Sequence, residues 1–344
     1  MKAVVYAGPG RVSVDDVSEP RLEEPDDALV RVTLSAICGT DLHLVSGHVD
    51  IEPGTSLGHE FVGEVVAVGS AVRGIRPGDV VLGSDFTACG ACWWCRRGDH
   101  WECPERQFFG TGTSFGKVLA GAQAEIVRVP HASTVLCPLP SGCPAEGAIF
   151  VGDALATGFA AAERGRVAPG DTVVVLGGGA VGQMASLAAQ AVGAAVVVVV
   201  DLVEGRRALA AGQGALAATP EEVDSLVRRL TAGRGADVAV DAVGGARVLD
   251  AALTLVRPRG TVVSVGAHFD PSFALPVNRA FAEELTVTFA IGDAMRLRDR
   301  LLPLVAAGVI DPTVVVTERV KLTEVPDAYE RFARHEAVKI LIDM

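Results

Sequence analysis

The feature that most constrains this chain is a run of 29 residues without a charged side chain, from Thr172 to Val200. A run of that length could span a bilayer as one helix. Its internal order argues against a single helix, because an apolar strand pattern at 172–176 leads directly into the glycine-rich segment 177–182. The run is therefore predicted to contain a buried strand, a glycine turn, a helix and a second buried strand that ends before Asp201.

The glycine turn matches the G-x-G-x-x-G pattern of dinucleotide-binding domains, because Gly177, Gly179 and Gly182 follow a strand and open a helix. Gly177 permits the tight turn, Gly179 lets the backbone approach a pyrophosphate, and Gly182 lets the helix pack closely on the strand. The N-terminus of the helix offers N–H groups to the phosphates. Val181 lies inside this turn and is counted among the predicted cofactor-binding residues.

An acidic residue, Asp201, closes the second strand, where it is predicted to accept hydrogen bonds from the adenosine ribose hydroxyls. Its charge would repel a 2′-phosphate, so NAD is the predicted cofactor. Arg206 and Arg207 keep NADP open, since nearby arginines can accommodate that phosphate. The other interpretation is a glycine-rich turn that binds no ligand. It is disfavoured because the preceding strand, the following helix and the acidic residue all match the dinucleotide-binding pattern.

The pattern on either side of this run predicts two domains. From about residue 153, apolar strands alternate with amphipathic helices, which is typical of a parallel sheet covered on both faces. The predicted strands are 172–176, 196–200, 237–241, 261–265 and 286–289, and the predicted helices are 180–192, 204–212, 221–232, 246–256 and 295–307. The first 150 residues are β-rich. The apolar segment 338–342 is predicted to be a strand that returns to the first domain.

Composition excludes several classes of protein. A formal net charge of −12 argues against nucleic acid as the main partner, and 49% hydrophobic residues argue against disorder. The first ten residues indicate a strand and a turn, not a signal peptide. Seven cysteines, an odd number, suit a reducing compartment, so a cytoplasmic protein without a membrane partner is expected.

Four of the cysteines form a C-x2-C-x2-C-x7-C pattern, whose members are Cys89, Cys92, Cys95 and Cys103. Four thiolates can close a tetrahedral cage around zinc, and the polar segment around them disfavours free core cysteines. An iron–sulfur cluster is the alternative, since Pro104 follows the last cysteine. The long last gap and the lack of a second such run favour zinc. A closed cage leaves no open position, so this zinc would be structural.

Three further residues, Cys38, His59 and Asp153, lie in separate segments of the chain. Taken singly, each has an ordinary interpretation: a core cysteine, a structural histidine with its hydrogen bonds satisfied, and a helix N-cap. Only in combination with the dinucleotide pattern do these residues resemble a specific family.

In combination, these motifs resemble the zinc-dependent medium-chain alcohol dehydrogenases. The resemblance covers nearly the whole chain, from Lys2–Val5 at the start to Ala328–Tyr329 and Val338–Lys339 at the end. It implies an α/β and β-rich two-domain fold, with a GroES-like catalytic domain at 1–152 and 291–344, a structural zinc lobe at about 86–106, and a Rossmann doubly wound parallel sheet at 153–290 that binds NAD. It also implies a cleft between the domains and a homodimer or homotetramer.

The resemblance assigns Cys38, His59 and Asp153 to a catalytic zinc, which makes two zinc ions per chain. The best-known members of the family have cysteine at the third position. Aspartate is a harder and less electron-donating ligand, so a more Lewis-acidic and more labile zinc is expected. Asp41 is expected to accept the free N–H of His59, and Glu60 to lie behind the metal.

The resemblance also implies a reaction, the interconversion of an alcohol with an aldehyde or ketone by hydride transfer to the nicotinamide. Thr40 would take the hydroxyl proton and pass it through the nicotinamide ribose to His43. Thr157 would pack beside the nicotinamide ring, and the backbone at Val265, Gly266 and Ala290 would bind its carboxamide.

Two alternatives to this function stay open, a non-catalytic NAD-binding regulatory protein of the same fold and an aldehyde dismutase with tightly held NAD. The predicted substrate is a small alcohol or aldehyde. Phe86, just before the cysteine lobe, either lines the substrate pocket or is a core aromatic.

Overall fold

The computed structural model describes residues 1–344 and divides into two compact units. The first unit contains Met1–Asp153 and Asp293–Met344, and the second contains Ala154–Gly292. The prediction began the second domain at Asp153 and ended it at residue 290. Asp153 belongs instead to the first unit, because its carboxylate lies beside Cys38 and His59 of that unit.

The second unit is built on a six-stranded parallel sheet with the order β10-β9-β8-β11-β12-β13. Its strands are β8 (Thr172–Leu176), β9 (Val196–Val200), β10 (Leu216–Ala218), β11 (Ala236–Asp241), β12 (Val256–Ser264) and β13 (Thr286–Phe289). The chain starts at the centre and the strand order reverses between β8 and β11. This doubly wound order places ligand sites at the carboxyl ends of the strands near that switch point.

Helices cover both faces of this sheet. They are α4 (Ala154–Arg164), α5 (Ala180–Ala191), α6 (Glu204–Gly212), α7 (Val223–Leu230), α8 (Ala246–Leu255) and α9 (Val277–Ala282). Val174 of β8 packs in one cluster with Leu249 of α8, whereas Val173 packs in another with Ala185 of α5. Because both faces of β8 are buried, every position of the strand is apolar or uncharged.

The charge-free run is therefore β8, the glycine turn, α5 and β9, as predicted. No single helix of the structure is long and apolar enough to cross a membrane, and only the bent pair Ala145–Gly152 with Ala154–Arg164 meets that test by length and composition. The prediction missed helix α4 and the short elements β10 and α9, and it began β12 at Thr261 where the strand begins at Val256.

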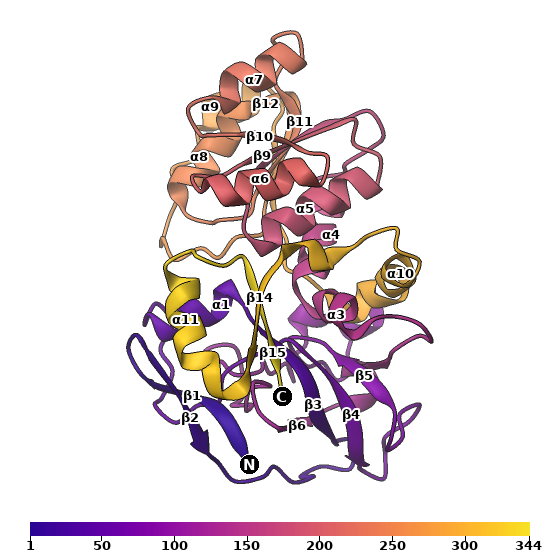
Figure 1. Ribbon diagram of the computed structural model, residues 1–344. Coiled ribbons are helices and arrows are strands. Elements are labelled where there is room, and N and C mark those ends of the chain that lie inside the picture. The colour runs from indigo at the N-terminus through magenta and orange to yellow at the C-terminus, as the bar shows by residue number, and fades with distance from the viewer. The chain divides into compact units, whose positions relative to one another are not determined.

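The first unit holds a seven-stranded sheet with the order β14-β15-β3-β4-β5-β7, in which β6 pairs with β3, and a separate β1–β2 hairpin. Its strands are β1 (Lys2–Gly8), β2 (Arg11–Asp16), β3 (Ala28–Ile37), β4 (Phe61–Val68), β5 (Val80–Gly83), β6 (Ile126–Val129), β7 (Leu136–Pro138), β14 (Val316–Lys321) and β15 (Lys339–Asp343). Strand β15 runs antiparallel to β3, so the C-terminal segment returns to the first domain as predicted (Figure 1).

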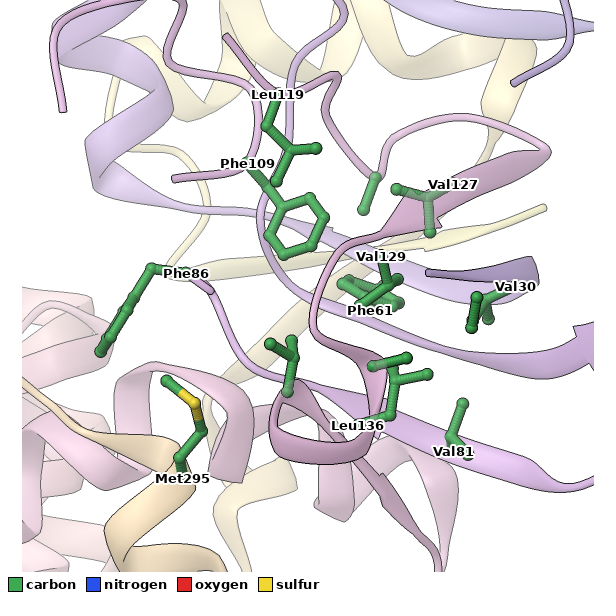
Figure 2. Packing of buried hydrophobic residues seen from close by; sticks show 14 of the residues in the cluster. Val30, Phe61, Val81, Phe86, Phe109, Leu119, Val127, Val129, Leu136 and Met295 are labelled. Carbon is green, nitrogen blue, oxygen red and sulfur yellow. The ribbon is translucent and has the colours of Figure 1, made fainter. Parts of the chain in front are cut away.

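The helices of the first unit are short, apart from α10. They are α1 (Gly39–Val45), α2 (Ala132–Val135), α3 (Ala145–Ala148), α10 (Ala294–Ala306) and α11 (Val325–Ala333), with 3-10 turns at η1 (Cys95–Arg97), η2 (His100–Glu102), η3 (Ile149–Gly152), η4 (Pro312–Val315) and η5 (Leu322–Glu324). The larger core cluster of this unit joins the sheet to the cysteine lobe, and Phe61, Phe86 and Phe109 lie in it among aliphatic side chains (Figure 2).

Candidate active site

The first part of the site is the junction between β3 and α1. Cys38 is the N-cap residue of α1, and its backbone N–H donates a 2.9 Å hydrogen bond to Oδ2 of Asp41 in the first turn. This capping contact fixes the Cys38 side chain at the end of a central strand. Thr40 and His43 follow on α1, one helical turn apart, and Sγ of Cys38 lies 3.9 Å from Oγ1 of Thr40.

The second part is the segment that enters β4. Gly58 has a φ of +91°, and a Cβ at that position would lie 2.4 Å from Cγ of Gln123. Glycine is therefore required there by both conformation and space. It brings His59 and Glu60, both buried, into the interior of the first unit just before Phe61 begins the strand.

Three predicted ligands converge here. Oδ2 of Asp153 lies 3.4 Å from Sγ of Cys38 and 3.4 Å from Nε2 of His59. The ligand atoms of Cys38, His59, Asp153 and Glu60 all lie within 4.8 Å of one another. Nε2 of His59 is buried and has no hydrogen-bond partner. An unpartnered ring nitrogen that faces a thiol and a carboxylate fits a zinc ion, whose preferred ligands are sulfur, imidazole nitrogen and carboxylate oxygen.

The electrostatics of the cluster also suit a cation. Burial, and next the charge of Asp153, raise the pKa of the Cys38 thiol to about 11. Burial by itself lowers the pKa of His59, but Asp41 and Cys38 outweigh it and raise that pKa well above its usual range. A divalent cation at the centre would favour the thiolate and the neutral imidazole, the forms that bind metal.

Glu60 forms a buried ion pair with Lys339. Nζ of Lys339 lies 2.5 Å from the Glu60 carboxylate, and both side chains are fully buried. Burial raises the pKa of Glu60 to about 7. Burial by itself lowers the pKa of Lys339. The charges of Glu60, Cys38 and Asp153 outweigh burial and raise this pKa above its usual range, so the lysine stays charged. No role was predicted for Lys339, although a lysine inside the apolar segment 338–342 is a usable signal for a buried ion pair.

Asp85 is a further buried acid, and its sequence context did not predict a role for it. It directly follows Ser84, whose hydroxyl donates a 3.2 Å hydrogen bond to it. Burial and the charge of Asp153 raise its pKa well above the usual range. Its neighbour Phe86 is fully buried and packs edge-on against Trp101, with ring centroids 5.1 Å apart, which favours the core-aromatic interpretation of Phe86.

The four lobe cysteines form a second cluster, around η1 and η2. Sγ of Cys92 lies 3.4 Å from Sγ of Cys95, and all four sulfur atoms lie within 4.8 Å of one another. Backbone N–H groups donate to these sulfurs: that of Cys89 to Cys103, and that of Cys92 to Cys89. Such bonds favour thiolates, and the backbone of Cys95 lowers the pKa of Cys92 to about 7. The arrangement fits a tetrathiolate zinc cage.

The glycine turn has the geometry of a phosphate cradle. Gly177 has a φ of +99°, and a Cβ on Gly182 would lie 1.7 Å from the carbonyl oxygen of Gly177. A Cβ on Gly179 would meet nothing within 4 Å, so that position leaves the N-terminus of α5 open. Val181 is half-buried in the first turn of α5. A pyrophosphate would approach the backbone at this open position.

Asp201 lies beside this turn at the carboxyl end of β9. Its Oδ2 accepts a 2.7 Å hydrogen bond from Gly178, its Oδ1 accepts one from Val203, and Nη1 of Arg206 lies 3.5 Å from Oδ2. Arg207 instead donates to the carbonyl oxygens of Asp201 and Leu202. Of the two arginines, only Arg206 thus shares the carboxylate that would meet the adenosine ribose.

The remaining predicted cofactor residues all lie in the second unit. Thr157 is buried in α4, where a Cβ on Gly292 would approach its Oγ1 to 2.3 Å. The N–H groups of Val265 and Gly266 both donate to the carbonyl oxygen of Asp241, and that of Ala290 donates to Ser264. These three N–H groups are therefore already bonded within the chain.

Comparisons with known proteins identify the family of the chain. Residues 24–141 match the alcohol dehydrogenase GroES-like domain, and residues 180–307 match the zinc-binding dehydrogenase family. A probable zinc-binding alcohol dehydrogenase of Mycobacterium tuberculosis is 38% identical over 96% of this chain and 84% of its own length. The chain belongs to the zinc-dependent medium-chain dehydrogenase/reductase family.

Two solved structures add detail. The alcohol dehydrogenase of Thermus sp. ATN1 has a TM-score of 0.96 and 42% identity, and the match covers 100% of this chain and 99% of that one. A putative zinc-binding dehydrogenase from Sinorhizobium meliloti, solved with NADP, has a TM-score of 0.88 and 30% identity over 100% and 99% of the two chains. The protein is accordingly an oxidoreductase that interconverts alcohols and carbonyl compounds with a nicotinamide cofactor.

Proposed function

We propose that the protein is an NAD-dependent alcohol dehydrogenase with two zinc ions per chain, a catalytic one at Cys38, His59 and Asp153 and a structural one at the four lobe cysteines. The observation that carries the catalytic site is the convergence of a thiol, a carboxylate and the unpartnered Nε2 of His59 within one buried cluster. Bound there, zinc would supply Lewis-acid polarisation of an alcohol oxygen and the nicotinamide would supply the hydride acceptor.

The chain itself provides the route for the proton. Thr40 lies beside Cys38, and a threonine hydroxyl can both accept and donate a proton. His43, one turn further along α1, lines a cavity of about 480 Å³ together with Tyr329, Glu330 and Arg334. Burial, and next the nearby His48, lower the pKa of His43 below 6.5, so its ring is neutral and able to accept a proton at neutral pH.

The preference for NAD is proposed from Asp201. Its carboxylate is held at the edge of the glycine turn by Gly178 and Val203, where a ribose hydroxyl would donate to it and a 2′-phosphate would be repelled. The contact of Arg206 with the same carboxylate is the feature that would support NADP.

We also propose that the chain forms a homodimer or homotetramer through the edge strand β13 of the second unit. That strand ends the sheet, its last residue Phe289 is strongly exposed, and so is Phe281 of the preceding helix α9. An exposed apolar edge is a ready surface for pairing with a second copy. Light scattering on the purified protein measures the state directly. A cytoplasmic location is proposed because none of the seven cysteines forms a disulfide.

The test of the function combines metal analysis with turnover. Wild-type protein should contain two zinc ions per chain and reduce NAD with at least one member of a panel of small alcohols. Cys38→Ser should lose one zinc ion and all turnover, because the thiolate ligand is gone. Cys137→Ser, which changes a free cysteine outside both clusters, is the matched control and should keep both. Two bound zinc ions without turnover on any alcohol or aldehyde would refute the proposal.

A further inference from the structure

A chain of buried polar side chains leads from helix α11 to the proposed metal ligand His59. Oη of Tyr329 donates a 2.9 Å hydrogen bond to Oε1 of Gln123. Nε2 of Gln123 donates to Oδ2 of Asp41 at 3.3 Å. Oδ1 of Asp41, in turn, lies 3.4 Å from Nδ1 of His59. All four side chains are almost completely buried, and they come from four distant segments of the sequence.

The direction of each bond in this chain is determined by the chemistry of its members. The amide of Gln123 faces two acceptors, the carboxylate of Asp41 and the carbonyl oxygen of Ala36, which lies 2.9 Å from Nε2. The NH2 group must point toward both, because an amide oxygen there would oppose two other oxygens. Oε1 is therefore directed toward Tyr329, whose hydroxyl can donate to it.

The two carboxylate oxygens of Asp41 have different hydrogen-bond partners. Oδ2 accepts from the backbone N–H of Cys38 and from Gln123, whereas Oδ1 has no other hydrogen-bond partner. Oδ1 is thus reserved for Nδ1–H of His59. A proton on Nδ1 leaves the lone pair of Nε2 directed at Cys38 and Asp153, which is the tautomer that binds metal.

Packing strengthens the link between Gln123 and the metal-binding segment. A Cβ on Gly58, the residue before His59, would lie 2.4 Å from Cγ and 2.8 Å from the backbone nitrogen of Gln123. The backbone that carries His59 therefore lies directly on Gln123, and a change in Gln123 reaches His59 both through Asp41 and through Gly58.

We infer that Gln123 and Tyr329 are positioning residues that hold Asp41 against His59 and so keep the imidazole oriented for the proposed catalytic zinc. This inference rests on the proposed function of that site. In a buried series of hydrogen bonds, the loss of one donor leaves the next side chain without its partner. The effect therefore passes along the series and does not end at the deleted group.

The experiment follows zinc release from the purified protein into a chromogenic chelator. Cys38→Ser lacks a ligand of the proposed catalytic zinc, so the phase of zinc release that is missing from this variant belongs to that site. Tyr329→Phe removes only the hydroxyl and should accelerate that phase about threefold to tenfold, the factor that the loss of one net hydrogen bond implies. Gln123→Met should accelerate it about tenfold or more, as loss of an outer ligand-supporting group does. Release from the four-cysteine site should not change.

The chain offers a matched control in Tyr6, its only other tyrosine, which is buried in the same core cluster. Tyr6→Phe should release both zinc ions at the wild-type rate. The inference fails if Tyr329→Phe releases zinc as Tyr6→Phe does, or if it accelerates both phases equally, which would indicate general loosening. If Cys38→Ser retains as much zinc as the wild type, the proposed metal site itself is wrong, and the inference is overturned with it.

Discussion

The substitution Lys339→Met tests the buried ion pair behind the proposed catalytic site. Nζ of Lys339 lies 2.5 Å from the carboxylate of Glu60, and the two side chains are 1% and 0% exposed. Methionine fills a similar volume but removes the charge. Removing one partner of a buried pair leaves the other unpaired, which costs about 3–5 kcal/mol of stability if the carboxylate stays charged.

The carboxylate can avoid part of this cost by binding a proton, and this makes the effect depend on pH. The pKa of Glu60 is already raised by burial from 4.5 to about 7 in the presence of Lys339. A raised pKa in the folded state means that stability falls as the pH rises, from the unfolded pKa up to the folded one. Without Lys339 the pKa of Glu60 should rise further, to about 8–9, a range known for buried glutamates.

Wild-type and variant proteins should therefore lose stability in parallel up to about pH 7, and only the variant should continue to lose it above. At about 1.4 kcal/mol per pH unit, the difference between them should grow by about 2 kcal/mol between pH 7 and pH 9. Urea unfolding followed by tryptophan fluorescence is the assay, because Trp93, Trp94 and Trp101 all lie in the first unit.

A second variant provides the control for this prediction. In Lys339→Met combined with Glu60→Gln, residue 60 no longer carries a carboxylate, so the growth of the stability difference from the wild type above pH 7 should disappear. A difference between wild type and Lys339→Met that stays constant from about pH 6 to pH 9 would refute the reasoning, since it would show that Glu60 does not titrate in response to the lysine.

Three further predictions concern the cofactor and the proton route. Asp201→Gly should relax the preference for NAD over NADP, measured as the ratio of kcat/KM for the two cofactors, because the repelling charge is removed. In the wild type, the rate of alcohol oxidation should decline at a pH below 6.5, where His43 becomes protonated, and His43→Gln should abolish this decline. Gly182→Ala should destabilise the protein by about 1–3 kcal/mol or more, because its Cβ would lie 1.7 Å from the carbonyl oxygen of Gly177.

Each of these has an outcome that contradicts it. An unchanged cofactor ratio in Asp201→Gly would place the adenosine pocket elsewhere. A decline at acid pH that persists in His43→Gln would assign the proton route to another group. For Gly182→Ala the control is Gly179→Ala, because a Cβ on Gly179 would meet nothing within 4 Å. This control should fold normally, but its affinity for the cofactor should fall. Equal stability of the two glycine variants would remove the packing argument.

The sequence pattern predicted the central strands of the second unit closely. Strands β8 and β9 have the predicted bounds, because strands buried on both faces are apolar throughout and stand out from amphipathic helices. The bounds of β13 were also predicted correctly, although this edge strand contains two threonines and no buried residue. Short elements were missed. Strand β10 has three residues, two of them exposed, and α9 has no buried residue, so neither produces a hydrophobic pattern.

What the sequence by itself determined are the sites whose members lie close together along the chain. The four lobe cysteines and the glycine turn each lie within one short segment, where spacing limits the geometry that the backbone can adopt. From the residues alone, Cys38, His59 and Asp153 had ordinary interpretations, and only the family resemblance joined them.

The tertiary structure alone decided which distant side chains meet. Glu60 and Lys339 are 279 positions apart, and Gln123 and Tyr329 are 206 positions apart. No local spacing rule connects such residues, because their contacts depend on how β15 joins β3 and how α11 packs in its core cluster. Buried polar groups must find partners, and the fold determines which partners are within reach.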